Sequence, residues 1–136
     1  MQTIYRATDN PTATKGAHFA ESRIDAEAYL DNQGYGGATV YEYSVDDANV
    51  LRCDSVTELV EIYMSSLDAD DDRSADDIRS DWTDSGISYV HDALEQVDGL
   101  VDLLAKEYDW VVFVDSYPDD CTTWRYLETV PISPVA

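Results

Sequence analysis

Short apolar stretches bounded by turn residues in the first part of the chain predict strands. We expect strands at residues 3–7, 16–20, 39–45 and 50–51. Between the second and third of these, apolar residues recur at helical spacing behind Ser22, and Asp25 completes a pattern that resembles a capping box. Residues 22–31 are therefore predicted to form a helix, which ends before the glycine-rich stretch 34–37.

Apolar residues at helical spacing continue through the middle of the chain. Ser55 and Glu58 form a second capping-box pattern, and the apolar positions of the helix that it predicts are Val56, Leu59, Val60, Tyr63, Met64 and Leu67. We expect a short helix around Ile78 and Trp82 and a longer one from about residue 88 to 106. The acidic stretch 68–77 between these helices is predicted to be a solvated loop.

The C-terminal part returns to strand patterns. Residues 109–115 are nearly all apolar, as expected of a central strand, and a proline-containing turn at 116–120 separates them from a final strand at 123–130. The predicted order is two strands, a helix, two strands, a helical segment and two strands. This order predicts an α+β fold: one small domain, residues 1–136, with a mixed sheet and a helical middle segment.

Acidic residues outnumber basic ones by 29 to eight, which gives a formal net charge of -21 on 136 residues. The hydrophobic fraction of 44%, with ten tyrosines and three tryptophans, is still enough for a folded core. Such a charge repels phosphate backbones, so direct nucleic-acid binding is not expected. Three explanations of the charge stay open: attraction to a basic protein that binds nucleic acid, imitation of DNA phosphates, and salt adaptation of a halophile's protein.

No metal site is expected from local motifs. Cys53 and Cys121 form no C-x-x-C pair and have no histidine-rich neighbourhood, so a zinc site is not expected and two free thiols are favoured over a disulfide. The stretch 68–77 imitates the start of a calcium loop, but Arg73 occupies the position that requires glycine. The chain also lacks an apolar run of membrane-span length and a basic segment followed by an apolar one at its start. We therefore expect a cytoplasmic protein that does not contact a membrane.

The order of several short segments resembles the ADP-ribosyltransferase fold. These segments are IYRAT (4–8), GAHFAES (16–22), VYEYSVDDANVL (40–51), YDWVVFVD (108–115) and TTWRY (122–126). In that fold a polar residue at the end of the first strand holds NAD, an aromatic residue on the second strand precedes a helix that lines the nicotinamide pocket, and a late acidic residue completes the site. Within the fold, the chain is similar to the small phage-encoded anti-CRISPR ADP-ribosyltransferases that inhibit type I-F Cas complexes. The resemblance skips the acidic middle of the chain.

The resemblance implies a site residue by residue. Arg6 would take the polar first-strand position against the ribose or pyrophosphate of NAD, which a guanidinium group suits. Phe19 and Tyr29 would line the nicotinamide pocket, and His18 would lie beside them. Asp115 would be the catalytic residue, because a carboxylate stabilises the oxocarbenium-like ribose that forms as nicotinamide leaves.

Each of these residues also has an ordinary structural interpretation. Arg6 can neutralise acidic neighbours, the aromatic residues can pack in the core, His18 can be an exposed or hydrogen-bonded strand residue, and Asp115 can begin a turn. The competitors for the catalytic role are Asp119, Asp120 and Glu128. Many members of the fold place a Glu just ahead of the last strand, where this chain has CTTW (121–124), so an active site here would have to be of an Asp type.

Two functions follow from the resemblance and the charge. The first is an NAD-dependent protein ADP-ribosyltransferase that acts as an anti-CRISPR inhibitor by modifying a basic, nucleic-acid-binding Cas effector, in the host-cell cytoplasm if a phage encodes the chain. The second is a non-catalytic acidic inhibitor that imitates DNA and binds such a protein directly. The first function uses NAD as a substrate, whereas the second does not. Neither function needs a metal. Binding or turnover of NAD discriminates between them.

Overall fold

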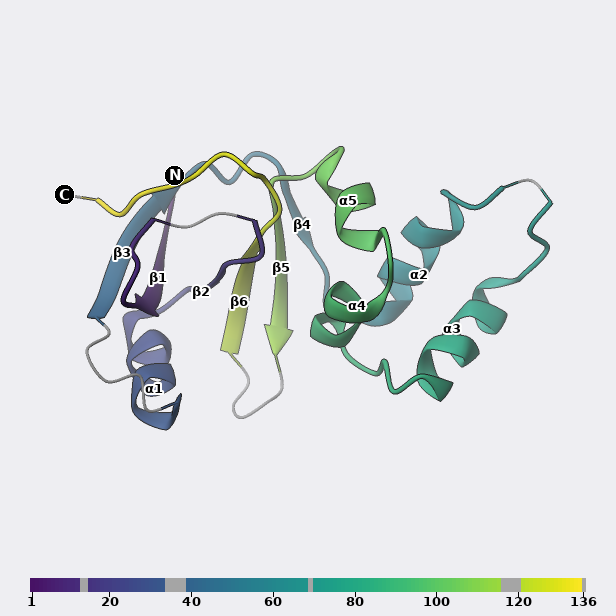
Figure 1. The fold of residues 1–136 in the computed structure, drawn as a ribbon, viewed down its shortest axis with the longest axis horizontal. Helices are drawn as coiled ribbons and strands as arrows, with labels where there is room; N and C mark the ends of the chain where they lie inside the picture. Colours follow the sequence, from purple (N-terminus) through teal and green to yellow (C-terminus); the bar gives the residue numbers. More distant parts are fainter. Residues whose placement is uncertain (13–14, 34–38, 69, 116–120, 136) are drawn as a thin grey trace.

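The computed structural model describes the chain except for residues 13–14, 34–38, 69, 116–120 and 136, and gives the backbone alone at residues 29–33, Asp115 and Cys121 (Figure 1). In chain order the elements are β1 (Gln2–Thr8), β2 (His18–Ala20), α1 (Arg23–Gln33), β3 (Thr39–Val45), β4 (Val50–Arg52), α2 (Val56–Met64), α3 (Ala75–Asp84), α4 (Val90–Gln96), α5 (Leu100–Ala105), β5 (Trp110–Asp115) and β6 (Cys121–Tyr126). The predicted order of strands and helices is confirmed.

The strands form one six-stranded mixed sheet in the order β3-β1-β2-β6-β5-β4. The pair β4 and β5 is parallel, and the other neighbouring pairs are antiparallel. Helix α1 contacts β1, β2 and β3, whereas α2 to α5 extend beyond β4 and β5 at the right of Figure 1. The architecture is therefore consistent with the predicted α+β class and its helical middle segment. We call residues 54–109 the helical half and the rest of the chain the sheet half.

Strand β5 supplies side chains to two hydrophobic cores, because successive residues of a strand point to opposite faces. Val111 and Phe113 pack with the helical half in a largely aliphatic core, which includes Leu59, Val60, Ile78, Leu94, Leu100 and Leu104. Trp110 and Val112 pack on the other face in an aromatic core, which includes Phe19, Tyr43, Trp124 and Tyr126. The apolar stretch predicted as a central strand is thus the structural link between the two halves.

The long helix predicted for residues 88–106 is wrong, because the structure contains two shorter helices, α4 and α5, in this range. Val97 ends α4 in an extended conformation, and Gly99 precedes α5 with a left-handed φ of 78°. Glycine adopts this conformation readily because it lacks a Cβ atom. The helical spacing of the apolar residues continued across this break and concealed it.

Two other local predictions are corrected. Ser55 begins α2 without a side-chain cap, whereas Ser74 and Asp77 form a complete capping box at the start of α3. The last strand ends at Tyr126 and not at residue 130. The chain bends at residues 129–130, and the Tyr126 hydroxyl donates to the carbonyl oxygen of Val130 at 2.7 Å. Across the described residues, no helix combines the length and the apolar character that a membrane span requires.

Candidate functional site

The strand register separates the two ends of the predicted NAD site. One row of paired residues crosses the sheet and consists of Tyr5, Ala20, Thr123 and Phe113. Arg6 lies one residue from this row on β1, on the side toward His18, whereas Asp115 lies two residues from it on β5, on the opposite side. Three strand spacings, about 14 Å in a flat sheet, lie between β1 and β5. Arg6 and the Asp115 position are an odd number of residues apart along the paired strands, so they belong to opposite faces of the sheet. A ligand that contacts both residues must therefore be elongated and must pass from one face of the sheet to the other.

Arg6 borders a cationic hollow with a volume of about 350 Å³. Its other described lining residues are Asn10, Thr12, Lys15, Gly16 and Ala17, so no acidic residue is among the lining residues that the structure describes. Within the described part of the chain, Arg6 has no carboxylate partner, and its guanidinium carbon lies 5.8 Å from the centre of the Phe19 ring. Lys15 donates through Nζ to Asp102 Oδ1 at 2.6 Å, in an exposed ion pair. We call this site the Arg6 hollow.

Phe19 occupies the aromatic core. Only 2% of its surface is exposed, and its ring lies edge-on to those of Tyr43 and Trp110, with centroid distances of 4.8 and 5.4 Å. Contact with a nicotinamide ring would therefore require this core to open, and the role of Phe19 stays a prediction. The roles of Tyr29 and Asp115 stay predictions as well, because their side chains lie outside the described part of the structure, as do residues 116–120.

His18 lies on the face opposite Phe19 and contacts the helical half. Its ring centre is 5.6 Å from that of His91 on α4, and the two ring planes are inclined by 59°. Glu95 lies one helical turn after His91 and accepts a hydrogen bond at Oε1 from Nη1 of Arg125 at 2.6 Å. Arg125 is the register partner of His18 on β6. We call His18, His91, Glu95 and Arg125 the histidine cluster.

Burial and neighbouring positive charge keep His18 neutral. Burial lowers the pKa of His18 from 6.5 to about 4, and the cationic group of Arg125 and then His91 act in the same direction. Within the described residues, Nε2 of His18 and Nε of Arg125 are buried and have no hydrogen-bond partner. Each buried polar group without a partner costs about 1–3 kcal/mol of stability. The histidine cluster therefore holds a neutral imidazole nitrogen that is available to a further ligand.

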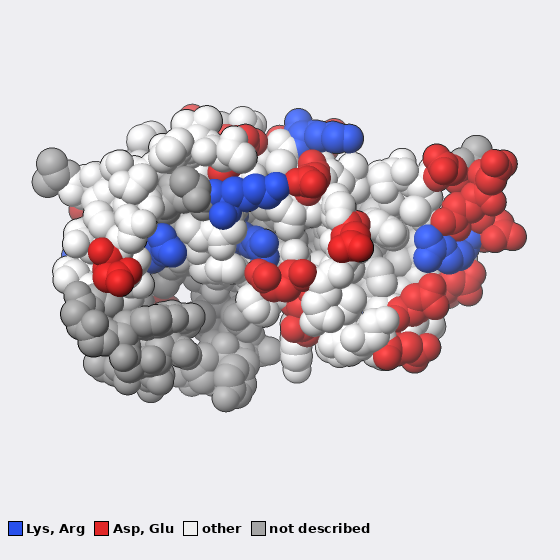
Figure 2. All heavy atoms as spheres, in the orientation of Figure 1, with Lys and Arg blue, Asp and Glu red and all other residues white. Residues whose placement is uncertain are grey.

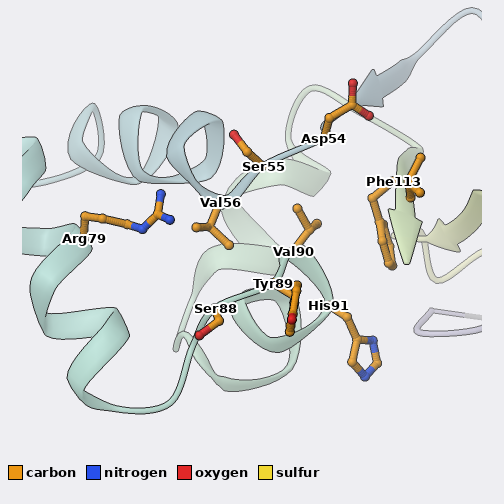
Figure 3. Close-up of a pocket in the computed structure, with 10 residues that line it drawn as sticks. Asp54, Ser55, Val56, Arg79, Ser88, Tyr89, Val90, His91 and Phe113 are labelled. Atoms are coloured by element: carbon orange, nitrogen blue, oxygen red, sulfur yellow. The ribbon is translucent and has the colours of Figure 1, made fainter. Parts of the chain in front are cut away.

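A smaller pocket of about 130 Å³ lies beside the histidine cluster, at the start of α4 (Figure 3). Figure 3 shows Arg79 extending from α3 on one side and Phe113 on β5 at the other, with His91 on the side nearer the strands. Val114, the residue before Asp115, also lines it. This volume is below the roughly 300 Å³ at which ligand pockets begin, so the pocket by itself is too small for a dinucleotide.

Sequence reasoning missed His91, Glu95 and Arg125. One signal was present, because HDALE (91–95) places a His and a Glu on one face of a helix. The connection of this helix to His18, 73 residues earlier in the chain, is a tertiary contact that no local motif contains. Comparisons of the chain with protein-family models, with curated proteins and with solved structures found no match.

Proposed function

We propose that the protein is an NAD-dependent ADP-ribosyltransferase that modifies a basic, nucleic-acid-binding protein. The observation that carries this proposal is the Arg6 hollow. In a chain with 29 acidic and eight basic residues, two basic side chains line one hollow, and its described lining residues include no carboxylate. Lys15 is paired with Asp102, so Arg6 is the cationic group among these described residues that is free to bind a ligand. Its volume of about 350 Å³ falls within the range of ligand pockets, and its charge suits the pyrophosphate of NAD.

Arg6 is the anion-binding group in this proposal. A guanidinium presents two parallel N–H donors to a phosphate and keeps its charge at all physiological pH values. The Arg6 guanidinium lies over the Phe19 ring, and the aromatic core behind that ring fixes its position. The electrostatic attraction is therefore directed into the hollow and is not spread over a flexible surface side chain.

Asp115 is the proposed catalytic group at the other end of the ligand. The bond between the ribose carbon and the nicotinamide nitrogen breaks, and its electron pair leaves with nicotinamide. The carboxylate stabilises the positive charge that develops on the ribose. A nucleophilic side chain of the target then bonds to the same carbon and releases a proton, so the products are ADP-ribosylated protein, nicotinamide and a proton.

The negative charge of the helical half supports the proposal that the target is a basic protein. Residues 54–109 hold 17 of the 29 acidic residues and three of the eight basic ones. Figure 2 shows acidic side chains gathered at the end of the molecule formed by α3 and the residues before it. Long-range attraction from such a surface speeds association with a positively charged protein. A Cas effector of a type I-F complex is the target that the resemblance implies.

The test is calorimetric titration of the protein with NAD, followed by labelled transfer to purified type I-F Cas proteins. We expect Arg6→Gln to weaken NAD binding about 10-fold or more, as loss of a hydrogen bond to a charged group does. Arg23→Gln is the matched control, because Arg23 also lies over an aromatic ring, that of Tyr5 at 5.4 Å, but outside the hollow. Absence of NAD binding, or equal loss in both variants, would reject the proposal.

The acidic side chains of α3 and of the residues before it also favour a second candidate function. A non-catalytic inhibitor would present the carboxylates of residues 68–77 and α3 to the DNA-binding surface of its target. This function predicts a stable complex with the target in the absence of NAD, competition with DNA, and no release of nicotinamide. The same titration and transfer assay therefore separates the two candidates.

A further inference from the structure

We propose that His18, His91 and Glu95 form a binding site for a zinc-like transition-metal ion. The chain contains two histidines, and the fold brings both of them together although 73 residues separate them in the sequence. One ligand atom from each of the three residues lies within 4.8 Å of the others. Two imidazoles and a carboxylate are a donor set that zinc and similar divalent ions bind.

The geometry requires a small adjustment of the side chains. Zinc bonds to nitrogen and oxygen are about 2.0–2.2 Å long, which places the ligand atoms of a tetrahedral site roughly 3.4 Å apart. The present upper separation of 4.8 Å must therefore shorten by about 1.4 Å at most. His91 and Glu95 lie on one face of α4 and are not fully buried, so rotation of their side chains can provide this movement.

His18 is the ligand whose surroundings are unexplained without a bound species. Its Nε2 atom is buried and lacks a hydrogen-bond partner among the described residues. A bound cation would accept the lone pair of this nitrogen and remove an energetic penalty that the fold otherwise carries.

Arg125 is compatible with this site as a partner of the carboxylate ligand. It donates to Oε1 of Glu95, which leaves the second carboxylate oxygen for the ion. Carboxylates that bind metals are commonly held by such outer hydrogen bonds. The positive charge of Arg125 lowers the affinity, so we expect weaker binding than in a zinc site without a neighbouring cation.

The site would join the two halves of the molecule. His18 is on β2, a strand of three residues, and the other two ligands are on α4 of the helical half. Three protein ligands leave a fourth position for water or a substrate atom. The metal site uses no group that the proposed NAD reaction requires from Arg6, and a titration with metal alone tests it independently of NAD.

The experiment is calorimetric titration of tag-free, chelator-treated protein with ZnCl₂ in excess Mg²⁺, which occupies the exposed carboxylates. We expect one zinc ion per chain, and shifts of both histidine imidazole signals in the NMR spectrum of the whole protein. His91→Asn and Glu95→Gln should each weaken binding about 10-fold or more. Glu107→Gln, an exposed carboxylate of the helical half outside the cluster, is the matched control and should leave the affinity unchanged.

The NMR measurement needs no variant, so the test does not depend on whether a variant folds. Unchanged imidazole signals at saturating zinc would overturn the proposal. Binding that Mg²⁺ abolishes, or that persists with equal affinity in folded His91→Asn protein, would overturn it as well, because the ion would then be bound by surface carboxylates.

Discussion

The sheet half and the helical half differ in both their cores and their charges. The core on the sheet side is rich in aromatic rings, whereas the helical core is mainly Leu, Val and Ile. The sheet half also has three arginines placed over aromatic rings: Arg6 over Phe19, Arg23 over Tyr5 and Arg52 over Trp124. The helical half carries most of the acidic residues. Under the proposed function, the sheet half binds the anionic ligand and the helical half attracts the basic target.

The largest expected effects come from the two cores. Trp110→Ala should lower the free energy of unfolding by about 3–5 kcal/mol and Leu59→Ala by about 2–5 kcal/mol, because both side chains are almost fully buried. Since β5 contributes to both cores, we expect either change to destabilise both halves together. Amide hydrogen exchange followed in α2 and in β1 measures this directly, as both elements should lose the same protection in each variant.

Unequal loss of hydrogen-exchange protection in the two halves would show that they fold separately. If Trp110→Ala weakened protection in β1 and left α2 unchanged, the two halves would be independent folding units. Val130→Ala is a suitable control, because this side chain is 66% exposed and should affect neither half.

The order of strands and helical segments was predictable from local pattern, because most of these segments have an apolar spacing typical of their type. The break at Gly99 was missed because the apolar spacing continues across it, and the capping box at Ser74 was missed within an acidic stretch. The site was less predictable. Arg6 was recognisable as a basic residue within a strand, but the histidine cluster depends on the contact between His18 of β2 and His91 of α4, which arises only in the folded chain.

The next largest expected effect tests Asp115 of the sheet half as the catalytic group. Asp115→Ala should lower the rate of ADP-ribosyl transfer at least 100-fold, equivalent to about 2.7 kcal/mol of transition-state stabilisation, because a carboxylate opposite developing positive charge is removed. NAD affinity should change little, since Arg6 supplies the anion contact. Transfer assays with matched NAD titrations measure both quantities, and Asp109→Ala, at the start of the same chain segment, is the control. Full activity of Asp115→Ala in a folded protein would refute the assignment.

Cys53 gives a smaller, pH-dependent effect at the boundary of the two halves. Burial, and then a hydrogen bond and charge from Glu58, raise the pKa of this free thiol from 9.0 to about 12. Below pH 9 the folded and unfolded states both keep the proton, so the thiol adds no pH dependence. Between pH 9 and 12 the unfolded chain loses the proton first, so stability falls by up to about 1.4 kcal/mol per pH unit.

Urea unfolding of the wild type and of Cys53→Ala at several alkaline pH values tests this. The variant should be less stable near neutral pH, because a buried side chain is shortened, but the difference should shrink as the pH rises above 9. If the difference in unfolding free energy between the wild type and Cys53→Ala stayed constant above pH 9, the raised pKa of Cys53 would be contradicted.

The smallest expected effect concerns the acidic loop of the helical half. Asp70 and Asp72 are exposed, whereas Asp71 is held by Arg73, whose Nη2 donates to it at 2.8 Å, and should be left in place. Replacing Asp70 and Asp72 with Asn should slow association with type I-F Cas proteins a few-fold at low salt and leave NAD turnover unchanged, because exposed charges act mainly on the rate of encounter. The matched control is Asp46→Asn with Asp47→Asn, an exposed acidic pair in the sheet half. Screening beyond roughly 8–10 Å should remove the difference near physiological salt. If the loop and control variants slow association equally, the net charge of the chain acts as a whole, and the helical half has no special part in directing the encounter.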